Sequence, residues 1–174
     1  MTQLLAAVRT PTGPAFTVVL VGHVASVLLA LVVTAAGAVA AVRVLRAKGD
    51  LSRSVRAYFS PGVNWAGRVL YLVPVFGAAL VAMSGGAYGF GAAWVDWGIV
   101  LWVASAALAE AVLWPAERRV QRGLASTGSP AVPGAVHGPP VPDAARRACR
   151  TMCLATAGVV ALIVAAMVVM FAKP

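Results

Sequence analysis

A single histidine near the start of the chain is the residue best placed to do chemistry in a membrane. His23 lies seven residues inside an apolar run, 16–42, or about 10 Å from its end at helical rise. At that depth, histidine is a candidate ligand for haem or copper, a candidate proton carrier, or a neutral side chain hydrogen-bonded between helices.

Small or weakly polar residues share the helical face of this histidine. They are Ser26, Ala30, Thr34, Gly37 and Ala41. Such a face lets a neighbouring helix approach closely. The pattern therefore favours a packing role for His23, with a haem, copper or ion-handling role as the alternative.

Arg68 and Glu110 form the second candidate group, as a structural ion pair. Arg68 comes three residues after Trp65, and Glu110 comes four residues before Trp114, so their depths match within about one turn. Pairing would lessen the cost of placing two charges in lipid. The alternative is a proton or ion path, because Asp96 and Glu110 are fourteen residues apart and share roughly one helical face.

The remaining reactive side chains predict no catalytic centre. Cys149 and Cys153 are one helical turn apart and have no third metal ligand near them in sequence. Met83 is a conceivable second ligand, whereas His137 belongs to a predicted loop and does not suggest bis-histidine haem binding. No serine–histidine–carboxylate set or phosphate-binding glycine loop is present, so a non-enzymatic function is favoured.

The elements that carry these residues are membrane helices. Of 174 residues, 61% are hydrophobic and 11% are charged, whereas soluble domains have about a quarter charged residues. The apolar residues form four runs, each long enough to cross a bilayer: 16–42, 65–83, 94–114 and 149–171. The chain is therefore predicted to be a single all-α membrane domain over 1–174, a four-transmembrane-helix bundle.

Prolines mark two of these spans. Pro74 lies inside the second span, where it would leave the carbonyl of Leu70 without its usual donor and kink the helix. Pro115 directly follows the third span and is expected to mark its end at Trp114.

Two further segments are expected between the spans. Residues 51–59 are predicted to form a short interfacial helix on anionic lipid, with Leu51, Val55, Tyr58 and Phe59 on one face. Residues 126–142 are rich in proline, glycine and serine and are predicted to be a flexible cytoplasmic loop.

The charges predict how the spans are oriented. The net charge is +9, and most cations lie in two loops: Arg43, Arg46, Lys48, Arg53 and Arg56, then Arg118, Arg119, Arg122, Arg146, Arg147 and Arg150. The positive-inside rule places both loops in the cytoplasm and both termini outside. Nucleic acid is not an expected partner, because no stacking aromatics alternate with the arginines.

The setting of the chain follows from the same features. Its arginine-, alanine- and valine-rich composition suggests a bacterial cytoplasmic (inner) membrane protein that passes the bilayer several times. Its expected partners are the lipid bilayer and other membrane subunits, or further copies of itself.

Several short motifs resemble a bacterial family of predicted integral membrane proteins, domain of unknown function 2269. They are Val21–Val24 around the early histidine, Tyr88–Trp94 in a turn, and Leu113–Pro115 leading into Arg118 and Arg119. The resemblance covers about 18–124 and the general plan of four helices. It implies no activity, because the family has none established.

The family is in turn similar to the membrane domain of copper-resistance proteins and to haem-binding membrane proteins with an early histidine. This similarity implies a copper or haem role for His23. Those relatives carry a Trp-Gly pair a turn or two later, where this chain has Ala30 and Leu31.

The orientation can be tested with reporter fusions. A reporter fused after Pro133 should be active only in the cytoplasm, and one fused after Lys173 only outside, because the arginine-rich loops stay inside. Reversal of either result would contradict the four-span topology with both termini outside.

Overall fold

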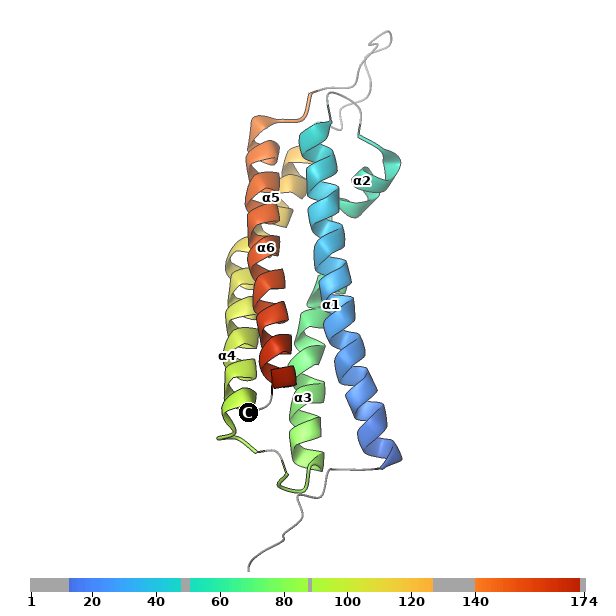
Figure 1. The fold of residues 1–174 in the computed structure, drawn as a ribbon. Coiled ribbons are helices and arrows are strands. Elements are labelled where there is room, and N and C mark those ends of the chain that lie inside the picture. The colour runs from blue at the N-terminus through green and yellow to red at the C-terminus, as the bar shows by residue number, and fades with distance from the viewer. Residues whose placement is uncertain (1–12, 48–50, 88, 127–139, 173–174) are drawn as a thin grey trace, which may run out of the picture.

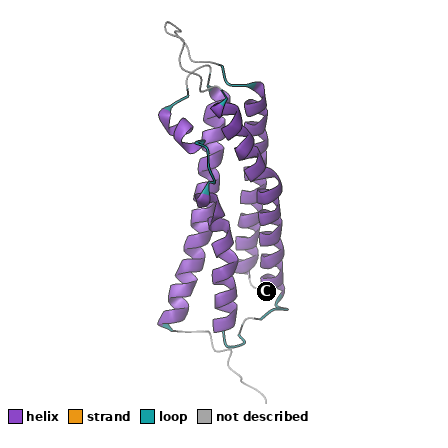
Figure 2. Ribbon diagram, turned by 180° about the vertical axis from the view of Figure 1, so that it is seen from behind, coloured by secondary structure: helices purple, strands orange, loops and turns teal. Residues whose placement is uncertain are grey.

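The computed structural model describes residues 13–47, 51–87, 89–126 and 140–172. Within these ranges all regular structure is helical (Figure 2). Four helical spans are long and apolar enough to cross a membrane: Pro14–Arg46, Trp65–Met83, Ala93–Ala125 and Asp143–Ala172. The predicted all-α bundle of four helices is confirmed (Figure 1). Most of the loop predicted at 126–142 lies outside the described residues.

The spans differ in length, so the bundle extends beyond a bilayer at one end. Helix α1 (Pro14–Arg46) has 33 residues and α6 (Asp143–Ala172) has 30, which gives lengths of about 50 and 45 Å. A bilayer has a hydrocarbon core of about 30 Å. The surplus length lies at the cation-rich end, defined here as the end of the bundle that holds Arg46, Arg118 and Arg147 (top of Figure 1).

The second span is shorter and combines two types of helix. It begins as the 3-10 helix η1 (Trp65–Tyr71) and continues as α3 (Leu72–Met83), so Pro74 falls in the first turn of α3. The Leu70 carbonyl, which lies four residues before this proline, accepts a hydrogen bond from the indole N–H of Trp102 at 3.0 Å. A side chain of the third span thus replaces the donor that the proline removes.

The third span does not end at Trp114 as the sequence suggested. It consists of α4 (Ala93–Leu108), a π-helical turn η2 (Ala109–Leu113) and α5 (Trp114–Ala125) in one continuous helix. The Trp114 N–H bonds to the Ala109 carbonyl, five residues back. This wider turn lets the helix pass Pro115, which has no N–H to donate.

The tightest packing lies at the cation-rich end. Its fully buried residues are mostly small: Ala41, Val44, Ala116, Val120, Ala145 and Cys149. Small side chains allow helices α1, α5 and α6 to approach closely. The guanidinium of Arg146 on α6 also donates to the carbonyls of Leu45 and Ala47, at 2.9 and 2.8 Å, and so caps the end of α1.

Helix α2 (Arg53–Tyr58) completes this packed end. The predicted short helix is present, but its apolar face does not lie on lipid as expected. Val55 and Phe59 are buried in the same core as α1 and α6, whereas Arg53 and Arg56 are exposed. The amphipathic pattern was correct, and the surface that covers it is the bundle itself.

The opposite half of the bundle is more open. Helix α3 has no buried residue. It runs along α1 and has no extensive contact with α4 or α6. Its close approaches to α1 occur at two glycines, where the ring of Phe76 faces Gly22 and His23 faces Gly77.

Candidate sites at the membrane boundary and on the first span

Four side chains form a cluster where the second and third spans meet, called here the boundary cluster. An Arg68 guanidinium nitrogen lies 2.8 Å from Oε1 of Glu110, and the Tyr71 hydroxyl donates to the same oxygen at 2.5 Å. The Arg68 guanidinium also lies 3.7 Å from the ring centroid of Trp114. The structure therefore brings together the two residues proposed as an ion pair, and adds two aromatic partners.

The ion pair of the boundary cluster lies on the outside of the bundle, whereas Trp114 is buried. The side chains of Arg68 and Glu110 are 25% and 49% exposed. The pair is thus less enclosed by protein than we expected from its predicted depth in the membrane. Glu110 belongs to the π-helical turn η2, and such turns are frequent at functional sites.

Asp96, the other acid of the third span, has a local role. It lies in the first turn of α4 and accepts the backbone N–H of Gly91 at 3.2 Å. Asp96 and Glu110 are about 20 Å apart at helical rise. Between them the helix carries no titratable side chain, and its one hydroxyl, that of Ser105, donates to the Leu101 carbonyl at 2.8 Å. A proton path along this span would therefore lack a continuous chain of titratable groups.

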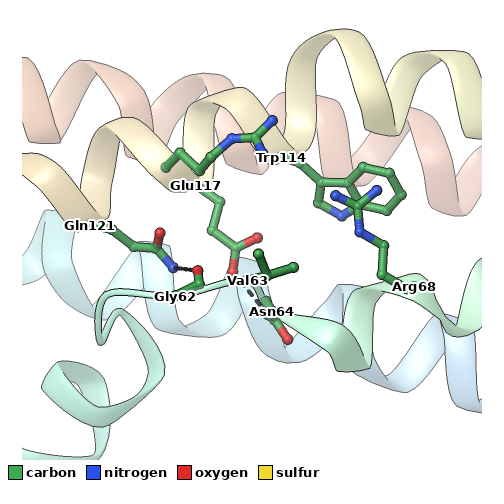
Figure 3. Close-up of a pocket in the computed structure, with 8 residues that line it drawn as sticks. Gly62, Val63, Asn64, Arg68, Trp114, Glu117 and Gln121 are labelled. Carbon is green, nitrogen blue, oxygen red and sulfur yellow. Dashed lines mark hydrogen bonds between the residues drawn. The ribbon is translucent and has the colours of Figure 1, made fainter.

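A second polar group, which the sequence analysis missed, lies deeper in the cation-rich end. Glu117 is only 5% exposed, and it accepts a hydrogen bond from the Asn64 amide at 2.9 Å (Figure 3). The same amide also donates to the Tyr58 hydroxyl at 3.2 Å. Gln121, one turn further along α5, donates to the Gly62 carbonyl at 3.4 Å. These bonds join α2 and the loop before η1 to α5.

The spacing of Glu117 could have predicted its burial, but Pro115 suggested that the helix ends before this residue. Helical spacing from Trp114 puts Glu117 and Gln121 on the inner face of a helix that continues past Pro115.

Burial, followed by the nearby Glu117 carboxylate, raises the pKa of Tyr58 above its usual value. Its hydroxyl therefore stays protonated and available as a donor.

His23 is held between α1 and α3. The residue is 9% exposed, and its Nδ1 lies 3.0 Å from the Val73 carbonyl oxygen. A carbonyl only accepts, so Nδ1 carries the proton and Nε2 of the neutral ring has its lone pair available. The backbone carbonyl of His23 also accepts the Ser26 hydroxyl at 2.7 Å.

The other proposed ligands are not gathered around this histidine. Met83 ends α3, ten residues after Val73, and so lies about 15 Å along the helix from the His23 contact. Cys149 is buried and Cys153 half-buried, and both are free thiols. Within the described ranges, no three histidine, cysteine or acidic residues are grouped to hold a metal. His137 lies outside those ranges.

Comparison with known proteins does not assign this chain to a family. No family model, curated protein or solved structure matches the chain. The resemblance to domain of unknown function 2269 therefore stays a prediction.

Two substitutions of His23 separate a packing role from a ligand role. His23→Leu removes the bond to Val73 and should destabilise the protein by about 1 kcal/mol. His23→Asn places an amide donor near the position of Nδ1 and should retain most of that stability. Thermal unfolding in detergent measures both effects. If His23 is instead a haem or copper ligand, both variants should lose the visible spectrum or metal content of the wild type.

A double-mutant cycle tests the Arg68–Glu110 pair. Glu110→Gln and Arg68→Leu each leave one charge unpaired. The losses of stability in the two single variants should therefore add up to more than the loss in the double variant. We expect a coupling free energy of at least about 0.5 kcal/mol, limited by the exposure of both side chains. Unfolding in lipid or detergent gives the four values. Strictly additive losses would show that the charges act independently.

Proposed function

We propose that this chain is a non-enzymatic accessory or assembly component of a larger complex in a bacterial cytoplasmic (inner) membrane. The observation that supports this is the uncovered side of α3, where none of the 12 residues is buried. In a closed four-helix bundle each helix packs against two neighbours. Helix α3 packs extensively along α1 alone among the spanning helices, which leaves room for a helix of another subunit.

The boundary cluster supports the same proposal. It lies at the start of the second span, just before α3, and exposes a carboxylate and a guanidinium in a region where contact with acyl chains is costly. Polar groups of a neighbouring subunit would satisfy these side chains better than lipid tails. The small-residue face of α1 does not call for a partner, because Ala30 and Ala41 are already buried and Gly37 already faces Met152 of the same chain.

A photo-crosslinking experiment tests this assignment. A benzophenone amino acid replaces Val75, which is 61% exposed on α3, and in a matched control replaces Val18, which is 71% exposed on α1. We expect the probe at position 75 to yield one protein adduct of constant mass in native membranes, and the control to yield lipid adducts only.

The mass of the adduct distinguishes another subunit from a second copy of the chain. Lipid adducts at both positions, together with a lone monomer after purification in mild detergent, would contradict the proposal.

His23 supports a second candidate function, the binding of haem, copper or another ion. A histidine whose Nδ1–H is fixed by a backbone carbonyl is oriented as ligand histidines usually are, and the bond to Val73 provides this arrangement. The paired Leu and Asn variants described above separate this candidate function from the packing role.

A further inference from the structure

A pocket opens next to the boundary cluster, between the loop at residues 62–64 and helix α5 (Figure 3). It is small and open to the outside. Arg68, Trp114 and Arg118 line it from the two spans. Two guanidinium groups therefore lie at one hollow, with an aromatic ring beside them.

The surroundings of the pocket indicate its depth. Trp65, the residue after the loop, is 76% exposed, and Val63 is also exposed. Tryptophan is enriched at the level of lipid headgroups. Arg68 lies one turn further along η1. The pocket therefore opens where the phosphates of the lipids on the cation-rich side are expected.

The charges in the pocket leave cationic donors available. Arg68 uses one guanidinium nitrogen for Glu110, and a guanidinium has five N–H donors. Arg118 is exposed and forms no ion pair with any described carboxylate. Glu117 also lines the hollow, but it is buried and already accepts the Asn64 amide.

We propose that this pocket binds the phosphate of an anionic phospholipid in the leaflet on the cation-rich side. The phosphate would lie between Arg68 and Arg118, because planar guanidinium groups match phosphate oxygens in geometry and charge. The acyl chains would run along the outer surface of η1 and α4. A lipid fits better than a soluble phosphate because the opening adjoins exposed apolar side chains at membrane level.

An anionic headgroup fits better than a zwitterionic one. Arg68 is paired with Glu110, which lies beside the pocket, and the one carboxylate that lines the pocket, that of Glu117, is buried. The charge left for a headgroup is that of Arg118, which is exposed on α5 and lines the pocket, and basic residues near a bilayer surface attract anionic lipid. This inference shares Arg68 with the proposed assembly role but is tested separately, because the crosslinking probe at Val75 lies outside the pocket.

Native mass spectrometry of the delipidated, full-length protein tests the inference. The protein is titrated with phosphatidylglycerol, with phosphatidylethanolamine and with inorganic phosphate. Arg118→Gln is compared with Arg119→Gln, a matched control with the same charge change on an exposed neighbour that does not line the pocket. We expect one tightly bound phosphatidylglycerol, a loss of affinity of about tenfold in Arg118→Gln, and little change in the control.

Three outcomes would overturn the inference. Equal losses in both variants would mean that lipid binds to the basic surface in general. Equal affinity for phosphatidylethanolamine would remove the preference for an anionic headgroup. Tight binding of inorganic phosphate without lipid would make the ligand a soluble anion. Arg68→Gln serves as a second variant and should also weaken phosphatidylglycerol binding, with its thermal stability recorded in parallel.

Discussion

The need to satisfy every backbone carbonyl inside a membrane shapes the second and third spans of this protein. Each carries a proline, and each proline removes one donor from the helical ladder. The second span obtains a replacement from the indole of Trp102, and the third widens into a single π turn. The same turn contains Glu110, so the boundary cluster is built on the backbone irregularity that Pro115 imposes.

A second consequence is the unequal packing of the two ends. Alanines, valines and Cys149 bring α1, α5 and α6 together at the cation-rich end, and α2 covers their side. In the other half, α3 has no buried residue of its own. The bundle thus combines a firmly packed end with a side that the chain itself leaves uncovered.

The sequence was sufficient for the features that depend on local periodicity and depth. The four spans, the inward face of His23 and the matching depths of Arg68 and Glu110 all follow from helical rise and residue type. The continuation past Pro115 could not be predicted, because a π turn depends on what the surrounding structure tolerates. The burial of Val55 and Glu117 depends on which surface covers an amphipathic face, and periodicity does not specify that surface.

The cap that Arg146 places on α1 has a consequence for biosynthesis. The hydrogen-bonded groups of Arg146 and Leu45 are separated by 101 positions in the chain. While the polypeptide is being made, the last carbonyls of the first span therefore have no such partner until the ribosome has added the beginning of the fourth span. The first span must remain in the bilayer as an incomplete unit during that interval. A chain interrupted before Arg146 would leave those carbonyls without this cap.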